Sequence, residues 1–298
     1  MHGTVSKGPL ADKGTGGTVL QEEFMIRNVI ALYFSPSGET AKITKKIANE
    51  IAERMNDACV DGVDVTDLDL LSEPPRSELE FSDESIAVIG MPVFLGRIPL
   101  PCVKLLQKMH GHGTLTVATV TYGNSTYGDS LYELYSFAED QGFNVVSAGA
   151  FISQHAIFNR IAEARPDIED LQKIIEFSSL TAKKLRHFCG TSIRELRAKP
   201  APLEIKGSLP TRMPLRLPIH PSANDLCVHC GKCAEICPVG AIDPQDPNKI
   251  NARKCISCTA CIRACEQGAR GFFGPMSAAS RLALEMLYSR RKDPEWFL

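Results

Sequence analysis

The order of apolar and polar positions along the chain predicts strands that alternate with helices. Residues 28–34 (NVIALYF) form an unbroken apolar run, as expected of a buried parallel strand. Residues 41–55 carry apolar side chains at Ile43, Ile47 and Ile51, which is a helical spacing. Because the polar residues 35–40 (SPSGET) separate the two segments, they predict a strand, a turn and a helix that open an α/β unit.

The same alternation continues to about residue 188. Further strands are predicted at 60–65, 86–90, 114–121 and 143–152, the first being the weakest, and helices at 99–109, 129–141 and 166–188. Proline suits the first turn of the last helix. Five strands that alternate with helices predict an α/β fold with a doubly wound, five-stranded parallel sheet.

The pattern changes after residue 189. Six prolines with basic residues between them occupy residues 194–221, which predicts a semi-rigid, extended linker rather than a packed element. The predicted division is a disordered leader at 1–22, an α/β domain at 23–189, a Pro-rich basic linker at 190–221, a cysteine-rich module at 222–274 and a helical tail at 275–298. The leucines of the tail have helical spacing, so we expect it to pack on one of the domains.

Composition and charge limit the classes of protein to which this chain can belong. The chain has 298 residues, of which 44% are hydrophobic and 23% charged, and it contains no apolar run long enough for a membrane span. Since we find no signal peptide either, we expect a cytoplasmic protein. The formal net charge of −2 disfavours nucleic acid as the main partner. Residues 1–189 carry a formal charge of −8 and residues 190–298 carry +6. This asymmetry indicates either that the two halves dock on each other or that the domains simply vary in charge.

Eight of the eleven cysteines form two runs with the spacing C-x2-C-x2-C-x3-C, and each cysteine of the first run recurs 28 residues later. A cubane iron–sulfur cluster needs four thiolates, and in the two-cluster arrangement the fourth cysteine of each run binds the cluster of the other run. The predicted ligands are Cys227, Cys230, Cys233 and Cys265 for a first [4Fe–4S] cluster and Cys255, Cys258, Cys261 and Cys237 for a second. A pair of structural zinc sites is the alternative, although zinc ribbons commonly use separated C-x2-C pairs.

This segment resembles bacterial two-cluster ferredoxins at all eight ligand positions. Glu266 stands where the second run would have proline, and we expect its charge to lower the reduction potential of the first cluster. The remaining cysteines, Cys59, Cys102 and Cys189, are interpreted as small buried or surface thiols rather than nucleophiles.

The turn at residues 35–40 has the composition of a phosphate-binding loop. Hydroxyl groups at Ser35, Ser37 and Thr40 stand beside free N–H groups at a helix start, and Gly38 allows the backbone to approach a ligand closely. No lysine follows in the Walker pattern, so a nucleoside triphosphate is not expected. The alternative is a capped helix start that binds nothing.

The turn resembles the [ST]-x-[ST]-G-x-T loop of flavodoxin-like domains, and the resemblance covers about residues 27–187. It implies that FMN lies at the carboxyl ends of the strands, where the strand order switches. The residues implied in FMN binding are Ser35, Ser37, Gly38, Glu39, Thr40, Pro92, Val93, Phe94, Gly96, Thr121, Tyr122, Gly123, Asn124 and Tyr127. Phe94, Tyr122 or Tyr127 would cover the flavin ring, unless these side chains simply pack in the core, because the only tryptophan, Trp296, lies in the tail.

The order of the two halves resembles flavodoxin–ferredoxin fusion proteins of anaerobes, often called EFR-type ferredoxins. We therefore expect an electron-transfer protein that relays electrons between two [4Fe–4S] clusters and FMN for a redox partner protein. The protein could act as a monomer or as a homodimer. The alternative is an FMN-dependent reductase of small molecules, in which the protein's own clusters supply electrons to FMN. His155 is the one candidate proton donor for such a reaction. No catalytic residue is assigned, and no dinucleotide-binding motif is present.

Overall fold

The computed structural model describes residues 26–59, 62–188, 200–209 and 219–298. The predicted leader at 1–22, Cys189 and most of the proline-rich linker lie outside these ranges, and the side chain of Cys59 is also outside the description.

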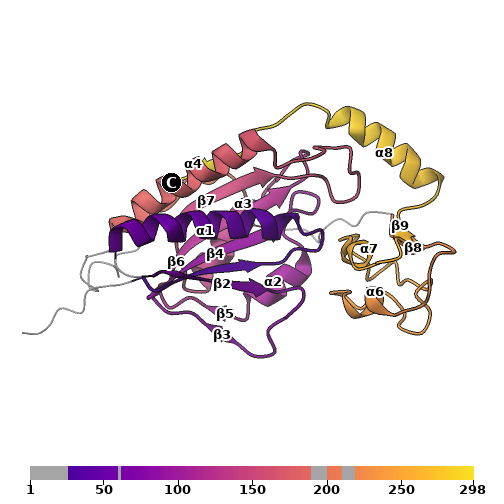
Figure 1. Cartoon of the computed structure of the whole chain (residues 1–298), viewed down its shortest axis with the longest axis horizontal. Helices are drawn as coiled ribbons and strands as arrows, with labels where there is room; N and C mark the ends of the chain where they lie inside the picture. The colour runs from indigo at the N-terminus through magenta and orange to yellow at the C-terminus, as the bar shows by residue number, and fades with distance from the viewer. Residues whose placement is uncertain (1–25, 60–61, 189–199, 210–218) are drawn as a thin grey trace, which may run out of the picture.

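A six-stranded sheet organises the larger domain (Figure 1), with the strand order β10-β7-β6-β4-β1-β2. Five of these strands run parallel, namely β1 (Asn28–Tyr33), β2 (Asp64–Asp69), β4 (Ser85–Pro92), β6 (Leu115–Tyr122) and β7 (Asn144–Ile152). Their order is that of the flavodoxin-like doubly wound fold, in which the connection switches direction between β1 and β4. The predicted fold class is confirmed.

Helices cover both faces of the sheet because their apolar stripes need a partner. The helices α1 (Glu39–Cys59) and α4 (Ile168–Arg186) enclose one core, where Phe151 and Phe177 pack edge to face at 5.3 Å. The helices α2 (Leu100–Leu106) and α3 (Ser130–Asp140) lie over the other core. The short strands β3 (Leu79–Glu80) and β5 (Met109–His110) form a separate parallel pair beside it.

Two of the predicted strand positions need correction. The strand predicted at 60–65 is β2 at Asp64–Asp69, since this edge strand is largely exposed and its sequence DVTDLD lacks the apolar run of a buried strand. The sixth strand, β10 (Glu295–Phe297), pairs antiparallel with β7 and lies in the tail that was predicted to be helical. Three residues are too short to give a periodic signal.

The described part of the linker is packed, contrary to the prediction. Leu203 and Ile205 are buried in the core that α2 and α3 cover. The hydroxyl of Ser208 donates to Asp129 at 3.1 Å. The apolar side chains at alternate positions bury against the domain, and the surrounding prolines had concealed that strand-like pattern.

The cysteine-rich module is small and has little apolar core of its own. It contains the helices α6 (Lys232–Glu235) and α7 (Ala260–Arg263) and the antiparallel strands β8 (Ser222–Ala223) and β9 (Arg270–Gly271). The helix α8 (Pro275–Leu287) then leads back to the sheet (Figure 1). Contrary to the expectation that it packs on a domain, α8 leaves Leu282, Met286 and Leu287 exposed. No helix in the described part of the chain is long and apolar enough to cross a membrane.

Candidate functional site

The turn between β1 and α1 uses some of its polar groups for its own structure. The Ser35 hydroxyl accepts the N–H of Ala41 at 2.9 Å, and the Ser35 carbonyl accepts the N–H of Gly38 at 3.2 Å. Gly38 has a φ of +92°, which is the left-handed conformation that glycine tolerates. Within the described residues, the amides of Ser37, Glu39 and Thr40 donate to no protein acceptor. These donors at a helix start suit one phosphate group.

The loop after β4 is fixed by backbone contacts. The N–H of Val93 donates to the carbonyl of Thr121 at 2.9 Å, and Phe94 and Arg97 form a reciprocal backbone pair. Gly96 packs so closely on Gly128 that a Cβ atom on Gly128 would lie 2.6 Å from the Gly96 carbonyl oxygen. The loops after β4 and β6 are therefore held as one rigid unit.

The carboxyl end of β6 contains a buried polar atom without a hydrogen-bond partner among the described residues. The hydroxyl of Thr121 is buried and, among the described residues, has no hydrogen-bond partner. Gly123 has no room for a side chain, because a Cβ atom there would lie 2.7 Å from His155. An unsatisfied buried hydroxyl between two rigid loops fits a polar ligand at this edge of the sheet.

The three aromatic candidates differ in their surroundings. Tyr122 is buried in the core and packs edge to face on Tyr127 at 5.7 Å; burial raises the pKa of Tyr122 to about 12. The Tyr127 hydroxyl hydrogen-bonds to Glu295 of the tail. Phe94 and Tyr127 are both partly buried, but Tyr127 is held by Tyr122 and Glu295, so Phe94 is the aromatic side chain of the three that is most available to a ligand. Trp296 packs on Phe177 instead.

The tail covers the loop after β6. The side-chain amide of Asn124 donates to the carbonyls of Tyr288 and Arg290, at 2.8 and 2.9 Å, and its oxygen accepts the N–H of Lys292 at 3.1 Å. Because the Asn124 side chain is occupied by the tail, only its backbone is left for the FMN contact that the resemblance implies.

His155, the proton donor named for the reductase, is engaged in its own loop. Its Nδ1 atom accepts the N–H groups of Ile157 and Phe158, both at 3.2 Å. Burial lowers the pKa of His155 to about 4, so the imidazole is neutral at pH 7.

The two halves of the cysteine module have matching backbones. Left-handed residues recur 28 positions apart, at His229 and Ser257, at Gly231 and Thr259, and at Gly240 and Gly268. Equivalent amides also donate to sulfur: that of Ala241 to Cys237 at 3.2 Å and that of Ala269 to Cys265 at 3.3 Å. The internal duplication in the sequence is thus an internal symmetry of the structure.

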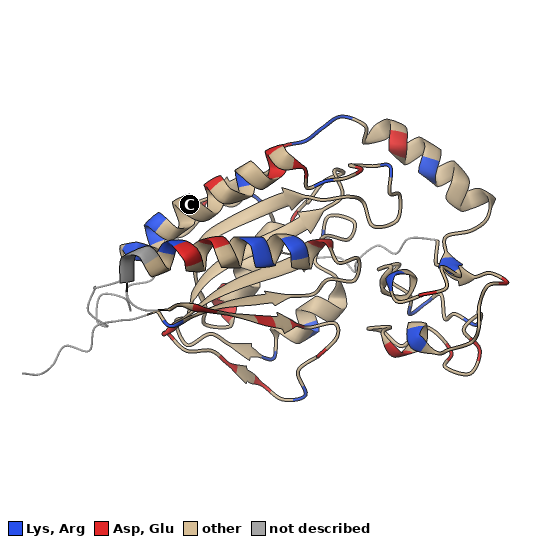
Figure 2. Cartoon of the chain, viewed as in Figure 1, with Lys and Arg blue, Asp and Glu red and all other residues tan. Residues whose placement is uncertain are grey.

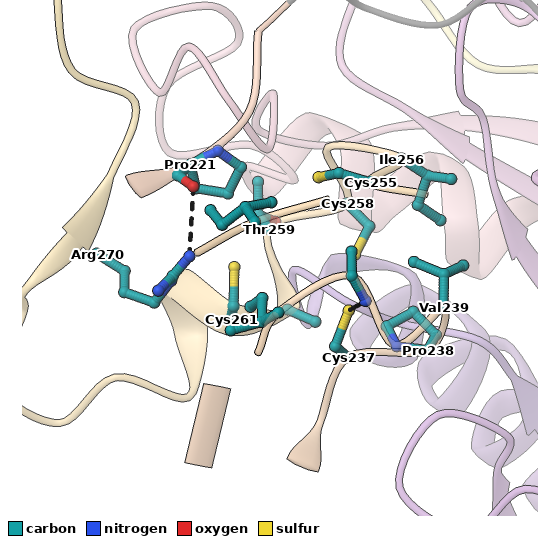
Figure 3. A pocket seen from close by; sticks show the side chains of 14 residues that line it. Pro221, Cys237, Pro238, Val239, Cys255, Ile256, Cys258, Thr259, Cys261 and Arg270 are labelled. Atoms are coloured by element: carbon teal, nitrogen blue, oxygen red, sulfur yellow. Dashed lines mark hydrogen bonds between the residues drawn. The ribbon is translucent and has the colours of Figure 1, made fainter. Parts of the chain in front are cut away.

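The eight cysteines, none of which forms a disulfide among the described residues, surround two separate cavities. One is lined by Cys237, Cys255, Cys258 and Cys261, whose sulfur atoms point into a shared space (Figure 3). The other is lined by Cys227, Cys230, Cys233 and Cys265. The structure therefore brings together the two sets of four that the crossed assignment names.

The arrangement suits clusters better than single ions. Among the described histidine, cysteine, aspartate and glutamate side chains, no three converge closely enough to hold one metal ion. A cubane takes one thiolate at each iron, so its ligands surround a space instead of meeting at a point.

One other prediction about this module needs comment, and the prediction that Cys102 is a small buried or surface thiol agrees with the structure. The Glu266 carboxylate lies in solvent and pairs with Lys232 at 2.5 Å, so its charge is neutralised and screened. The effect expected from Glu266 on a cluster potential stays a prediction, and this ion pair in solvent would weaken it. Cys102 is fully buried in α2, and burial, followed by the nearby charge of Cys258, raises the pKa of its thiol.

The module lies against the predicted flavin edge of the sheet. Figure 1 shows it beside the end of the sheet at which α1 begins, which is where the parallel strands have their carboxyl ends. Arg263 of α7 donates to the Ser35 carbonyl at 2.9 Å, and its guanidinium lies 3.6 Å from the position that a Cβ atom on Gly38 would take. The proximity of Cys258 to Cys102 marks the same interface.

Sequence reasoning missed four contributors to these sites: Arg263, Arg270, Thr259 and the tail. Alignment of the two cysteine runs would have exposed Arg270 and Thr259 as departures from the repeat, because their counterparts are Ile242 and Gly231. No local pattern marks Arg263 or the tail contacts, which depend on how the two halves meet.

Comparisons with known proteins found one matching family profile and several similar solved structures. A family profile described as a 4Fe-4S dicluster domain matches residues 226–269. Solved structures similar to the chain include a flavodoxin from the domain Archaea, with 21% identity over 54% of this chain and 99% of that one, at a TM-score of 0.38. A WrbA-like flavodoxin from Agrobacterium tumefaciens has 19% identity over 54% of this chain and 98% of that one, at a TM-score of 0.36.

Rubredoxin oxygen:oxidoreductase from Desulfovibrio gigas has 17% identity over 56% of this chain and 38% of that one, at a TM-score of 0.36. A search of curated proteins found no match. The strand order and the family profile together show that the chain joins a flavodoxin-like α/β domain to a 4Fe-4S dicluster domain.

Proposed function

We propose that this protein transfers electrons between two [4Fe–4S] clusters and FMN on behalf of a redox partner protein. The contact of Arg263 with the phosphate-loop carbonyl of Ser35 carries the proposal, because it holds the cysteine module against the flavin edge of the sheet. When bound, each cluster carries single electrons and FMN holds one or two. Joining them in one chain lets single electrons be collected into pairs, or pairs be released singly.

Each set of four cysteines holds one cluster, and the sets cross between the two runs. The two cysteine-lined cavities support this assignment. Cys265→Ala tests it: the cluster of Cys227, Cys230 and Cys233 should be lost, although Cys265 belongs to the other run. Electron paramagnetic resonance of the variant, which reports each reduced cluster, gives the result. Loss of the cluster at Cys255, Cys258 and Cys261 instead would overturn the crossing.

The flavin site is built from the three loops at the carboxyl ends of β1, β4 and β6. The amides of Ser37, Glu39 and Thr40 would hold the phosphate, the hydroxyl of Thr121 would hydrogen-bond the flavin, and Phe94 would cover a face of the ring. The support is that these donors lack protein acceptors. A single phosphate site favours FMN over a dinucleotide flavin.

The exposure of the cysteines supports an order for the electron path. In the first set Cys230 is exposed, and the neighbouring Leu226 and Val228 are 61% and 63% exposed. In the second set Cys258 and Cys261 are buried, and Arg263, two residues after Cys261, contacts the phosphate loop of the flavodoxin half. We assign the first cluster to exchange with the partner protein and the second cluster to exchange with FMN.

In the reductase alternative, His155 would act as a neutral imidazole that donates only through its Nε2–H group, because its Nδ1 atom accepts two backbone N–H groups. The described residues give this alternative no further support, so we keep the carrier function.

Anaerobic reductive titration tests the carrier function. Protein purified without oxygen should contain about eight iron, eight sulfide and one FMN, and it should accept about four electrons per chain, one for each cluster and two for the flavin. After rapid mixing with a one-electron donor protein, cluster absorbance should change before flavin absorbance. Flavin that stays oxidised beside reduced clusters would refute the relay.

A further inference from the structure

The internal repeat of the cysteine module is broken at two positions, and both breaks place a polar group against the cysteines. The spacing of 28 residues pairs Gly231 with Thr259 and Ile242 with Arg270. The first repeat thus has a glycine and an apolar side chain where the second repeat has a hydroxyl and a guanidinium.

Arg270 lies buried between the two cysteine cavities and lines both of them. Its side chain donates to the carbonyl oxygens of Pro247 at 2.8 Å and Pro221 at 3.3 Å, the second of which is drawn in Figure 3. Its Nε–H group is buried and has no partner among the described residues. No described carboxylate forms an ion pair with this cation, and burial of an uncompensated cation is costly.

The missing counter-charge lies in the two cysteine sets. An Nη atom of Arg270 is 3.7 Å from the sulfur of Cys233, which belongs to the first set. In the second set, Arg270 lines the cavity together with Cys261. One guanidinium therefore lies against the cysteines of both proposed clusters.

Thr259 contributes to the second cavity alone. It lines the space between Cys255, Cys258 and Cys261 (Figure 3), and its buried hydroxyl has no partner in the described part of the chain. Its φ of +71° lies in the left-handed region, where threonine is strained and glycine is not. Gly231 takes the same conformation in the first repeat without that cost. A strained threonine with an unused hydroxyl points to a ligand in the cavity.

We propose that Arg270 and Thr259 donate hydrogen bonds to the sulfur atoms of the clusters and raise their reduction potentials, Arg270 at both clusters and Thr259 only at the second. Reduction adds negative charge to a cluster, and a buried cation or donor stabilises the reduced form more than the oxidised form. This inference rests on the proposed presence of two clusters.

A direction for electron flow follows. The second cluster receives both donors, so it is easier to reduce than the first. A one-electron donor protein that is oxidised at the exposed first cluster therefore passes its electron downhill to the second. Two such electrons, with protons from solvent, complete the two-electron reduction of FMN.

The repeat itself supplies the test variants. Arg270→Ile and Thr259→Gly install the residues of the first repeat, and the potentials of both clusters in the full chain are measured by redox titration with electron paramagnetic resonance. Arg270→Ile should lower both reduction potentials by at least about 59 mV, which corresponds to a tenfold change in the equilibrium constant of a one-electron reduction. Thr259→Gly should lower the potential of the second cluster only. A Cys230→Ser chain assigns the two signals, since it perturbs the first cluster.

Three variants serve as controls: two keep the charge or the hydroxyl, and one removes an exposed cation elsewhere in the module. Arg270→Lys keeps the charge and Thr259→Ser keeps the hydroxyl, so each should retain most of the parent potential. Arg253→Ile removes an exposed cation of the same module and should change little, because solvent screens it. Unchanged potentials in Arg270→Ile would overturn the role of Arg270, as would a shift of equal size in Arg253→Ile.

Two further outcomes are decisive. A shift of both clusters by equal amounts in Thr259→Gly would refute its confinement to the second cavity. If Arg270→Ile cannot retain iron, unchanged potentials in Thr259→Gly would overturn the proposal, and a selective shift would support it. Failure of electron transfer to FMN would contradict the relay but leave these shifts in place, so the two proposals fail separately.

Discussion

At the scale of single residues, the hydroxyl groups of the phosphate loop have different roles. Ser35 caps the start of α1, whereas no described residue hydrogen-bonds to the side chain of Ser37 or Thr40. The sequence presented all three hydroxyls as equivalent ligands, because the cap contact depends on the turn geometry. The structure separates a hydroxyl that the fold uses from two that a phosphate can use.

The double variant Ser37→Ala with Thr40→Ala should weaken FMN binding at least tenfold. A hydrogen bond to a charged group contributes about 1.5–3 kcal/mol, and a tenfold change corresponds to about 1.4 kcal/mol. Quenching of flavin fluorescence gives the affinity, and the iron content of the same preparation should remain that of the parent. Unchanged affinity in a folded variant would show that the flavin phosphate binds elsewhere.

His155 should make the protein less stable in mild acid. Its pKa is about 4 in the folded protein against 6.5 as an ordinary histidine, so the unfolded chain binds the proton first as the pH falls. Stability is then lost between pH 6.5 and 4, by up to about 3 kcal/mol, and is independent of this group above pH 6.5. Denaturant unfolding at several pH values should show a smaller loss for His155→Asn. Parallel pH curves for parent and variant would contradict the assignment.

At the scale of elements, the periodic segments were predictable and the short or non-periodic ones were not. The buried strands β1, β4, β6 and β7 and the helices α1, α3 and α4 lie within a few residues of their predicted bounds, since burial on one or both faces forces a repeating apolar pattern. The edge strand β2 and the three-residue β10 have no such pattern, because their pairing is decided by tertiary contacts. The packed segment at Leu203 has an alternate apolar pattern, but it is too short to stand out among the surrounding prolines.

One side chain, Asn124, makes three hydrogen bonds to the entry of the tail segment that carries β10. Asn124→Gly removes the contacts with Tyr288, Arg290 and Lys292 but keeps the backbone, because Asn124 has a φ of +59° that glycine also adopts. Hydrogen exchange of the amides in residues 288–297 should become at least about tenfold faster, since hydrogen bonds of about 1 kcal/mol each are lost. Amides of β4 and β6 serve as the internal control. Protection of the tail equal to that of the parent would show that β10 pairing alone holds it.

At the scale of the whole molecule, charge assists the docking of the two halves without dominating it. The basic segment after α8 lies at the acidic start of α4 (Figure 2), where Arg291 contacts Asp167 and Glu169. This agrees with the charges of −8 and +6 on the two halves. The contact at the phosphate loop is of another kind, because Arg263 meets a backbone carbonyl there. Total charge could indicate that the halves attract, but not which residues meet.

Arg263 should therefore contribute to flavin binding from the other half of the molecule. Its guanidinium lies beside Gly38 and the unpaired amides of the phosphate loop, so it adds a cation where the phosphate is expected. Arg263→Ala should weaken FMN binding about tenfold, because a charged hydrogen bond contributes about 1.5–3 kcal/mol, and Arg263→Lys should recover part of the loss. Arg253→Ala is the matched control, since Arg253 is an exposed arginine of the same module.

The comparison of these variants decides between two accounts of the interface. If Arg263 only docks the module, FMN affinity stays at the parent value in Arg263→Ala while electron transfer from cluster to flavin slows. If it also binds the phosphate, affinity and transfer fall together, and added FMN protects α7 from hydrogen exchange in the parent but not in the variant. In that case flavin binding and docking of the cluster module are linked, because the same side chain serves both.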